Sequence, residues 1–159
     1  MPTISVIFPF YNAKDSLLQA MESVSMQSIT DFECLLVNNN STDNSVEIAT
    51  AFARKDIRFR MLNESKQGVS YASNLGSYHA HGAYIARMDA DDIASPPDRL
   101  KFQYDFLAQN PNYGVVTGQV VFGGETQLAA GLYRYTEWVN SLKTAKPENS
   151  CHSLCADLN

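Results

Sequence analysis

The chain of 159 residues is long enough for one domain with a substantial hydrophobic core. Its 45% hydrophobic and 18% charged residues exclude a disordered protein, and its net charge of -5 argues against a nucleic-acid-binding surface, which is normally basic. The three cysteines do not form a disulfide framework, and there is neither an apolar run of about 18 residues nor a positively charged signal region, so we predict a cytoplasmic protein without a transmembrane segment.

Segments with strand and helix periodicity alternate along the chain. We predict strands over residues 4–8, 32–37, 57–62, 83–88 and 115–122, and helices over residues 15–28, 44–54, 69–81, 96–109 and 133–142. The first strand is expected to stop at Pro9, Ser41 or Thr42 to cap the second helix, and Gly82 to end the third helix. This alternation predicts an α/β fold with a mostly parallel sheet flanked by helices.

Three polar segments follow predicted strands, at the point where each strand ends. They are Tyr11-Asn12, Asn38–Asn40 and Asp89–Asp92. Ligands of open parallel sheets bind at the carboxyl ends of the strands, so we expect these segments to meet in one cleft. The alternative is a purely structural role, with the asparagines forming turns and Tyr11 covering the core.

Asp89, Asp91 and Asp92 follow an apolar strand directly. Clustered carboxylates repel one another, so the cluster is expected to need a cation. Oxygen ligands suit Mg²⁺ or Mn²⁺, and Mg²⁺ is typically held by one or two carboxylates together with substrate phosphates. We therefore predict a metal–diphosphate site here; the alternative is a solvated turn that caps the following helix.

An ordered set of motifs extends over about residues 3–122. Its members are Ser5–Asn12, Gln27–Glu33, Asn40–Ser45, Gly68 with Asn74 and Gly76, Gly82–Asp92 and Pro97–Leu100. In this order they resemble family 2 of the glycosyltransferases, whose fold is the Rossmann-like GT-A fold. The Asp89-Ala90-Asp91 triplet is similar to that family's D-x-D motif.

The resemblance implies a role for each matching position in binding a nucleotide-diphosphosugar donor. Pro9 and Tyr11 would border the nucleobase, and Asn39 would accept a hydrogen bond from it. Asp89 would lie near the ribose. Asp91 would bind Mn²⁺ or Mg²⁺ that bridges the diphosphate. Asp92 would be a second metal ligand, would share the ribose role of Asp89, or would orient the loop.

The chain also departs from the family pattern. Asn38-Asn39-Asn40 stands where two aspartates and a glycine are usual, and Ser73 replaces a common basic residue. No acidic motif matches the family's catalytic base, which leaves Glu125, Glu137 and Asp157 as downstream candidates. We therefore predict a donor-binding core over residues 3–122 and a partial or truncated acceptor-side extension over residues 123–159.

The resemblance implies a metal-dependent, inverting transfer of a sugar to the hydroxyl of a carbohydrate or lipid-linked acceptor, with peripheral association at the inner face of the membrane as one option. The alternative is a non-catalytic nucleotide-sugar-binding module, or a fragment that acts with a partner or a missing C-terminal half. Nucleotidyl transfer is a weaker third hypothesis, because Phe8–Lys14 lacks the Gly-rich, basic phosphate loop that it needs.

Overall fold

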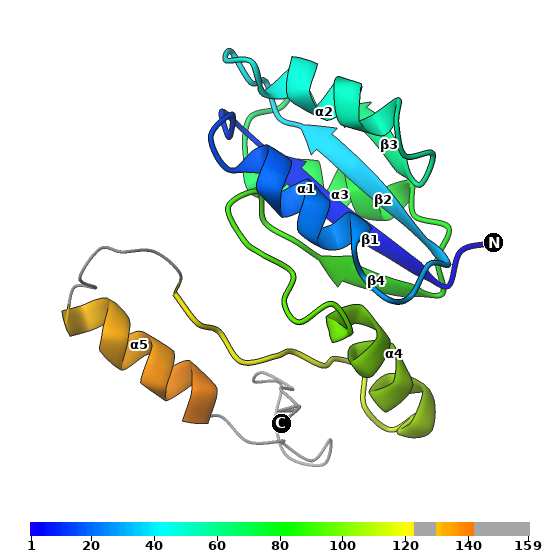
Figure 1. Ribbon diagram of the computed structural model, residues 1–159, viewed down its shortest axis with the longest axis vertical. Helices are drawn as coiled ribbons and strands as arrows, with labels where there is room; N and C mark the ends of the chain where they lie inside the picture. The colour runs from blue at the N-terminus through cyan, green and yellow to red at the C-terminus, as the bar shows by residue number, and fades with distance from the viewer. Residues whose placement is uncertain (123–129, 142–159) are drawn as a thin grey trace. The chain divides into compact units, whose positions relative to one another are not determined.

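The computed structural model describes residues 1–122 and 130–141 (Figure 1). The chain divides into two compact units, residues 1–100 and residues 101–159. The predicted division into a core over 3–122 and an extension over 123–159 stays a prediction, because residues 123–129 and 142–159 lie outside the described part.

The first unit is built on a four-stranded parallel sheet with the strand order β3-β2-β1-β4. Its strands are β1 (Ile4–Phe10), β2 (Phe32–Asn38), β3 (Phe59–Asn63) and β4 (Tyr84–Arg87). Three helices alternate with them: α1 (Leu17–Ser25), α2 (Ser45–Ala53) and α3 (Val69–Tyr78). The predicted α/β fold with a parallel sheet is therefore confirmed.

The core of this unit lies on both faces of β1, whose seven residues are all buried. A strand buried on both faces reads as a continuous apolar run, as it does here. Helices α1 and α2 cover one face of the sheet and α3 covers the other (Figure 1). On the α3 side, Gly76 lets the helix approach the sheet, because a Cβ atom there would lie 2.6 Å from Ile7 Cγ2.

The first strand does not stop at Pro9 as predicted but continues to Phe10. Backbone bonds to β1 alternate between its neighbours, since Met88 donates to the Ile7 carbonyl at 3.0 Å and Asn39 donates to the Phe10 carbonyl at 3.0 Å. The Pro9 nitrogen consequently faces the β4 side. Because β4 pairs with β1 only as far as Ile7, the missing N–H of Pro9 breaks no ladder bond.

Gly82 does not end the third helix as predicted, because α3 ends at Tyr78 with His79 as its C-cap. Gly82 instead packs against the start of β1. Its N–H donates to Ser5 Oγ at 2.8 Å, and a Cβ atom at this position would lie 2.5 Å from the Ser5 nitrogen. The glycine is thus explained by a close backbone approach rather than by a helix terminus.

The second unit contains α4 (Arg99–Gln109), which starts at the unit boundary, and α5 (Ala130–Ser141). The prediction of a strand at residues 115–122 is wrong, since this segment has no regular secondary structure. Its β-branched residues satisfy the pattern, but a strand also needs a pairing partner. The backbone of Val120 bonds instead to the Asn140 side chain, through its N–H and its carbonyl, both at 2.8 Å.

We expect Gly82→Ala to destabilise the protein by about 1–3 kcal/mol, because the added methyl group overlaps backbone atoms that cannot move independently. Gly114→Ala is the matched control, since nothing lies within 4 Å of its Cβ position. That variant should be neutral or more stable by up to about 1 kcal/mol. Chemical denaturation of both variants measures the difference, and equal stability would contradict the close-approach explanation.

Candidate functional site

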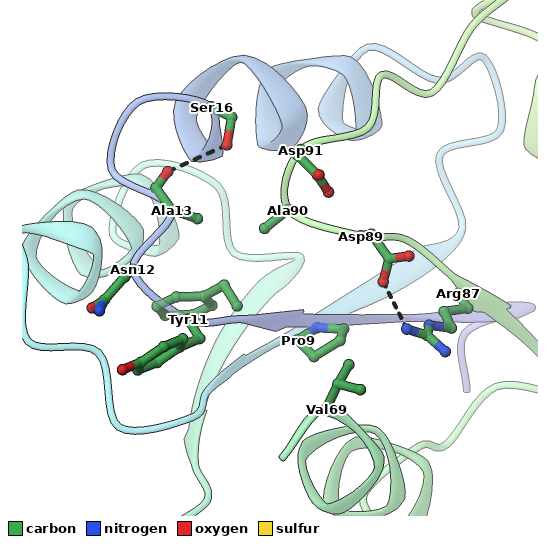
Figure 2. Close-up of a pocket in the computed structure, with 11 residues that line it drawn as sticks. Pro9, Tyr11, Asn12, Ala13, Ser16, Val69, Arg87, Asp89, Ala90 and Asp91 are labelled. Atoms are coloured by element: carbon green, nitrogen blue, oxygen red, sulfur yellow. Dashed lines mark hydrogen bonds and ion pairs between the residues drawn. The ribbon is translucent and has the colours of Figure 1, made fainter. Parts of the chain in front are cut away.

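An open pocket of about 430 Å³ lies at the carboxyl ends of β1 and β4 (Figure 2). It occupies the place where β1 continues beyond the end of β4. Pro9 and Val69 line its side toward α3, while Ala13, Ser16 and Asp91 line its side toward α1. The remaining lining residues are Phe10, Tyr11, Asn12, Arg87, Asp89 and Ala90.

The loop that carries Tyr11 is held by hydrogen bonds to the loop after β2. Asn12 has a positive φ of 48°, a conformation that asparagine tolerates better than most residues. Its side-chain oxygen accepts from the Thr42 N–H at 2.8 Å, and its own N–H donates to Ser41 Oγ at 3.1 Å. The N–H of Ala13 donates to Ser45 Oγ at 2.8 Å. These bonds fix the backbone around Tyr11, whose ring is 52% exposed.

Ser41 or Thr42 was predicted to cap α2, but it is Asp43 that accepts a hydrogen bond from the first backbone N–H of the helix. The Asp43 carboxylate accepts from the Ser45 N–H at 3.0 Å and from Ser45 Oγ at 2.5 Å. The hydrogen bond from the Ser45 hydroxyl is the main cause that lowers the pKa of Asp43. Ser45 therefore connects the start of α2 to the pocket loop at Ala13.

Asn39 is 3% exposed and does not line the pocket. Its Nδ2 donates to the carbonyls of Glu64 at 3.2 Å and Lys66 at 2.8 Å, and its Oδ1 accepts from the Gly68 N–H at 2.7 Å. The side chain thus holds the segment that leads into Val69, which does line the pocket. We expected Tyr11, Asn39 and Asp91 to line one cleft; Tyr11 and Asp91 do so and Asn39 does not. A hydrogen bond from a base to Asn39 stays a prediction.

The neighbouring asparagines also make turn contacts, as the structural alternative predicted. Asn40 has a positive φ of 64° and donates to the Ser65 carbonyl at 2.6 Å. Asn38 Oδ1 accepts from the Ser41 N–H at 2.9 Å. The run Asn38–Asn40 therefore organises the loops behind the pocket.

Two of the predicted carboxylates, Asp89 and Asp91, line the pocket, and Asp92 does not. Asp89 Oδ1 pairs with Arg87 Nη2 at 2.8 Å (Figure 2). Partial burial raises the pKa of Asp92, and the negative charges of Asp91 and Asp89 raise it further, while Arg99 and Arg87 offset part of this effect. The carboxylates of this loop therefore repel one another, as the sequence indicated.

No group of three or more His, Cys, Asp or Glu side chains converges as a preformed metal centre within residues 1–122 and 130–141. A cation of the Mg²⁺ type does not require one, because one or two carboxylates and substrate phosphates complete its coordination. Asp91 in the pocket and the adjacent Asp92 supply oxygen ligands of the right kind. The donor set therefore fits a divalent cation that binds together with a phosphorylated ligand.

Sequence reasoning did not assign Ala13, Ser16, Val69 or Arg87 to the site. Arg87 had a detectable signal, since it is a charged residue at the end of the predicted strand and lies two positions before Asp89. Among the residues that line the pocket, Arg87 is the one cationic side chain. Its guanidinium is paired with Asp89, so the lining keeps the uncompensated negative charge of Asp91, and an anionic ligand would need a cation beside it.

Of the three candidates for a catalytic base, the described residues include only Glu137. Glu125 and Asp157 lie outside them. Glu137 is an exposed residue of α5 and belongs to the second unit. The catalytic base therefore stays unassigned.

Within the described part of the chain, no helix has both the length and the hydropathy needed to cross a bilayer.

The family model and the relatives that match this sequence agree with one another. A family model described as glycosyl transferase family 2 matches residues 5–156. The chain is 44% identical over 93 residues to the uncharacterized glycosyltransferase YibD of Escherichia coli, a match that covers 58% of this chain and 27% of YibD. It is 39% identical over 111 residues to an uncharacterized glycosyltransferase of Haemophilus influenzae, which covers 69% of this chain and 44% of that protein.

Solved structures share the fold. TarS of S. aureus (residues 1–349), in complex with UDP-GlcNAc, matches with a TM-score of 0.70 and 21% identity over 84% of this chain and 38% of TarS. The mannosyltransferase PcManGT from Pyrobaculum calidifontis, in complex with GDP-Man and Mn²⁺, matches with a TM-score of 0.68 and 25% identity over 73% of this chain and 35% of PcManGT. The chain spans less than half the length of each of these four proteins.

We expect Asn39→Ala to lower the free energy of unfolding in the absence of nucleotide by about 1–3 kcal/mol, because it leaves the Gly68 N–H without its side-chain acceptor. Asn63→Ala, which removes an exposed side chain bonded to Asn38, should change it by less than about 0.5 kcal/mol. Urea denaturation of the ligand-free proteins compares the two variants. An unchanged stability for Asn39→Ala would contradict the loop-holding role of these hydrogen bonds.

Proposed function

The chain belongs to glycosyltransferase family 2, and we propose that it forms the donor-binding part of an enzyme that transfers a sugar from a nucleoside diphosphate to an acceptor hydroxyl. The observation that carries this proposal is the pocket at the ends of β1 and β4. It combines an exposed aromatic ring, Tyr11, with two carboxylates, Asp89 and Asp91, and a guanidinium, Arg87. These groups match the base, ribose and diphosphate of a nucleotide donor.

The proposed binding mode follows the arrangement of these groups. The base lies against Pro9 and Tyr11, where an aromatic face is available for stacking. Asp89, held by Arg87, contacts the ribose. Asp91, with Asp92 beside it, holds Mn²⁺ or Mg²⁺ on the diphosphate. Support for a metal-bound donor comes from PcManGT, which was solved with GDP-Man and Mn²⁺.

The chain's own residues would act mainly by binding and orientation. When bound, a divalent cation supplies positive charge that stabilises the departing nucleoside diphosphate. Asp91 retains that cation, and Arg87 adds a fixed positive charge at the same end of the pocket. Electrostatic stabilisation of this kind is strongest when the charged groups are positioned before the reaction.

The acceptor step is proposed in outline. A general base would deprotonate an acceptor hydroxyl for attack on the anomeric carbon with inversion, and the acceptor would be a carbohydrate or a lipid-linked molecule. Peripheral association with the inner face of a membrane is part of this proposal only for a lipid-linked acceptor.

A second candidate function is donor binding without transfer. It is favoured by one observation: within residues 1–122 and 130–141, the carboxylates that line the pocket are Asp89 and Asp91 alone. The proposed binding mode uses both for the donor and leaves neither to act as a base. Residues 1–159 would then act with a partner or with a longer polypeptide.

Removing the metal ligand tests the proposed site. Asp91→Ala should weaken Mn²⁺-dependent binding of UDP or GDP by at least about 10- to 100-fold, since it removes a ligand and the charge that retains the cation. Asp105→Ala, on α4, is the control and should bind like the original protein. Calorimetry with Mn²⁺ and with EDTA measures both. Equal affinity with and without metal in every protein would refute a metal-bridged diphosphate.

We also expect residues 1–159 alone to bind a donor but to transfer its sugar poorly, because a positioned general base contributes about 10²- to 10⁴-fold in rate. Slow donor hydrolysis should remain, since a bound metal ion activates the leaving group by itself. Release of nucleoside diphosphate, measured with and without a panel of sugar acceptors, separates the two activities. Robust transfer would contradict this expectation and would direct the search for the base to Glu125, Glu137 and Asp157.

A further inference from the structure

A buried glutamine at the end of α1 is bonded to the segment that follows the acidic loop. Gln27 is 3% exposed. Its Nε2 donates to the carbonyls of Ala94 at 2.9 Å and Pro96 at 3.2 Å, and its Oε1 accepts from the Leu100 N–H at 2.9 Å. Both ends of one amide therefore bind backbone groups of a single stretch, residues 94–100.

Ser23, one helical turn earlier, makes a second connection. Its Oγ accepts from the Ala94 N–H at 2.9 Å and donates to the Ala20 carbonyl at 2.7 Å. The N–H of Ser28 donates to the Pro97 carbonyl at 2.9 Å. The segment after the acidic loop thus lies along the C-terminal half of α1, and Ala94 is buried there at 5% exposure.

The acidic loop is therefore fixed at both of its ends. At its start, Met88 donates to the Ile7 carbonyl at 3.0 Å, where β4 leaves the sheet. At its end, Ala94 is held by Ser23 and Gln27. The three carboxylates at positions 89, 91 and 92 fall between these points. Ser16, just before α1, lines the same pocket as Asp91, so α1 extends from the pocket to the place where the loop is held (Figure 2).

We infer that Gln27, assisted by Ser23, is a positioning residue that holds Asp91 and Asp92 in place before a metal ion and a nucleoside diphosphate bind. This inference rests on the proposed function. Three mutually repelling carboxylates would otherwise spread apart in the absence of a cation. A loop already held in its binding conformation loses less conformational entropy when the ligand arrives, so preorganisation appears as affinity.

The amide group explains the choice of residue. Gln27 needs a donor for two carbonyls and an acceptor for one N–H, and only an amide side chain of this length presents both at its tip. Methionine keeps the length and apolar stem but removes these bonds. Gln27→Met is therefore the principal test variant, Ser23→Ala is the milder one, and Gln109→Met, at an exposed position of α4, is the matched control.

The variants are compared by calorimetry with UDP and GDP, in Mn²⁺ and in EDTA. Gln27→Met should reduce the gain in affinity that Mn²⁺ provides by at least about tenfold. This is the size expected when the net free energy of one or two hydrogen bonds is lost. Its metal-free affinity should stay within about twofold. Ser23→Ala should also lose affinity in Mn²⁺ but not in EDTA, to a smaller extent. Gln109→Met should lose affinity in neither.

Hydrogen exchange gives an independent readout. The Leu100 amide should exchange faster in Gln27→Met, and the Ala94 amide faster in Ser23→Ala, whereas β1 should keep its protection. If Gln27→Met does not fold, Ser23→Ala decides the question by the same measurements. The inference is overturned if folded variants keep the full Mn²⁺ effect, or if affinity falls equally with and without metal. Failure of the original protein to bind UDP or GDP with Mn²⁺ would instead refute the proposed function.

Discussion

The unequal lengths of two adjacent strands determine where the pocket of the first unit lies. β1 runs to Phe10, but β4 pairs with it only as far as Ile7. The chain leaves the sheet after Arg87, and the space beside Pro9 becomes the pocket. The carboxylates follow directly, so the position of Asp89 and Asp91 depends on where β4 ends. This constraint also explains why the pocket has contributions from both faces of the sheet, with Val69 on the α3 side and Ser16 on the α1 side.

Amide side chains hold each loop around this pocket. Asn12 connects the loops after β1 and β2, Asn39 holds the segment before α3, and Gln27 holds the segment after the acidic loop. In each case the partner is a backbone N–H or carbonyl that makes no hydrogen bond within a strand or helix. The side chain accepts from such an N–H or donates to such a carbonyl. Loops at the ends of parallel strands have many such backbone groups, and leaving them buried without partners would be costly. The hydrogen bonds that satisfy these backbone groups also hold the loops that carry the pocket side chains.

Much of the fold could be predicted because its signals are local. The apolar runs of β1 and β2 and the carboxylates after β4 are visible in the sequence, and the ordered motifs identify the family. The failures concern long-range facts. The end of β1 depends on the length of β4, and Gly82 is explained by the distant backbone of Ser5. Residues 115–122 have a strand pattern but pair with no strand in the part of the chain that the structure describes. Asn39 was predicted to bind the base, which stays a prediction, and its hydrogen bonds to residues 64–68 depend on tertiary structure and leave no mark in the local pattern.

Pro9 has a further effect at this edge. Beyond Ile7, β1 pairs with no strand of the described residues on the β4 side, and an edge of this kind can pair with another extended chain through its unpaired N–H and C=O groups. The next residue whose backbone faces that side is Pro9, which has no N–H to offer. An incoming strand would therefore find an acceptor without the accompanying donor and could not extend the sheet there. Pro9 therefore disfavours strand addition beside the pocket. This edge of the sheet can stay open to solvent without becoming a site of aggregation.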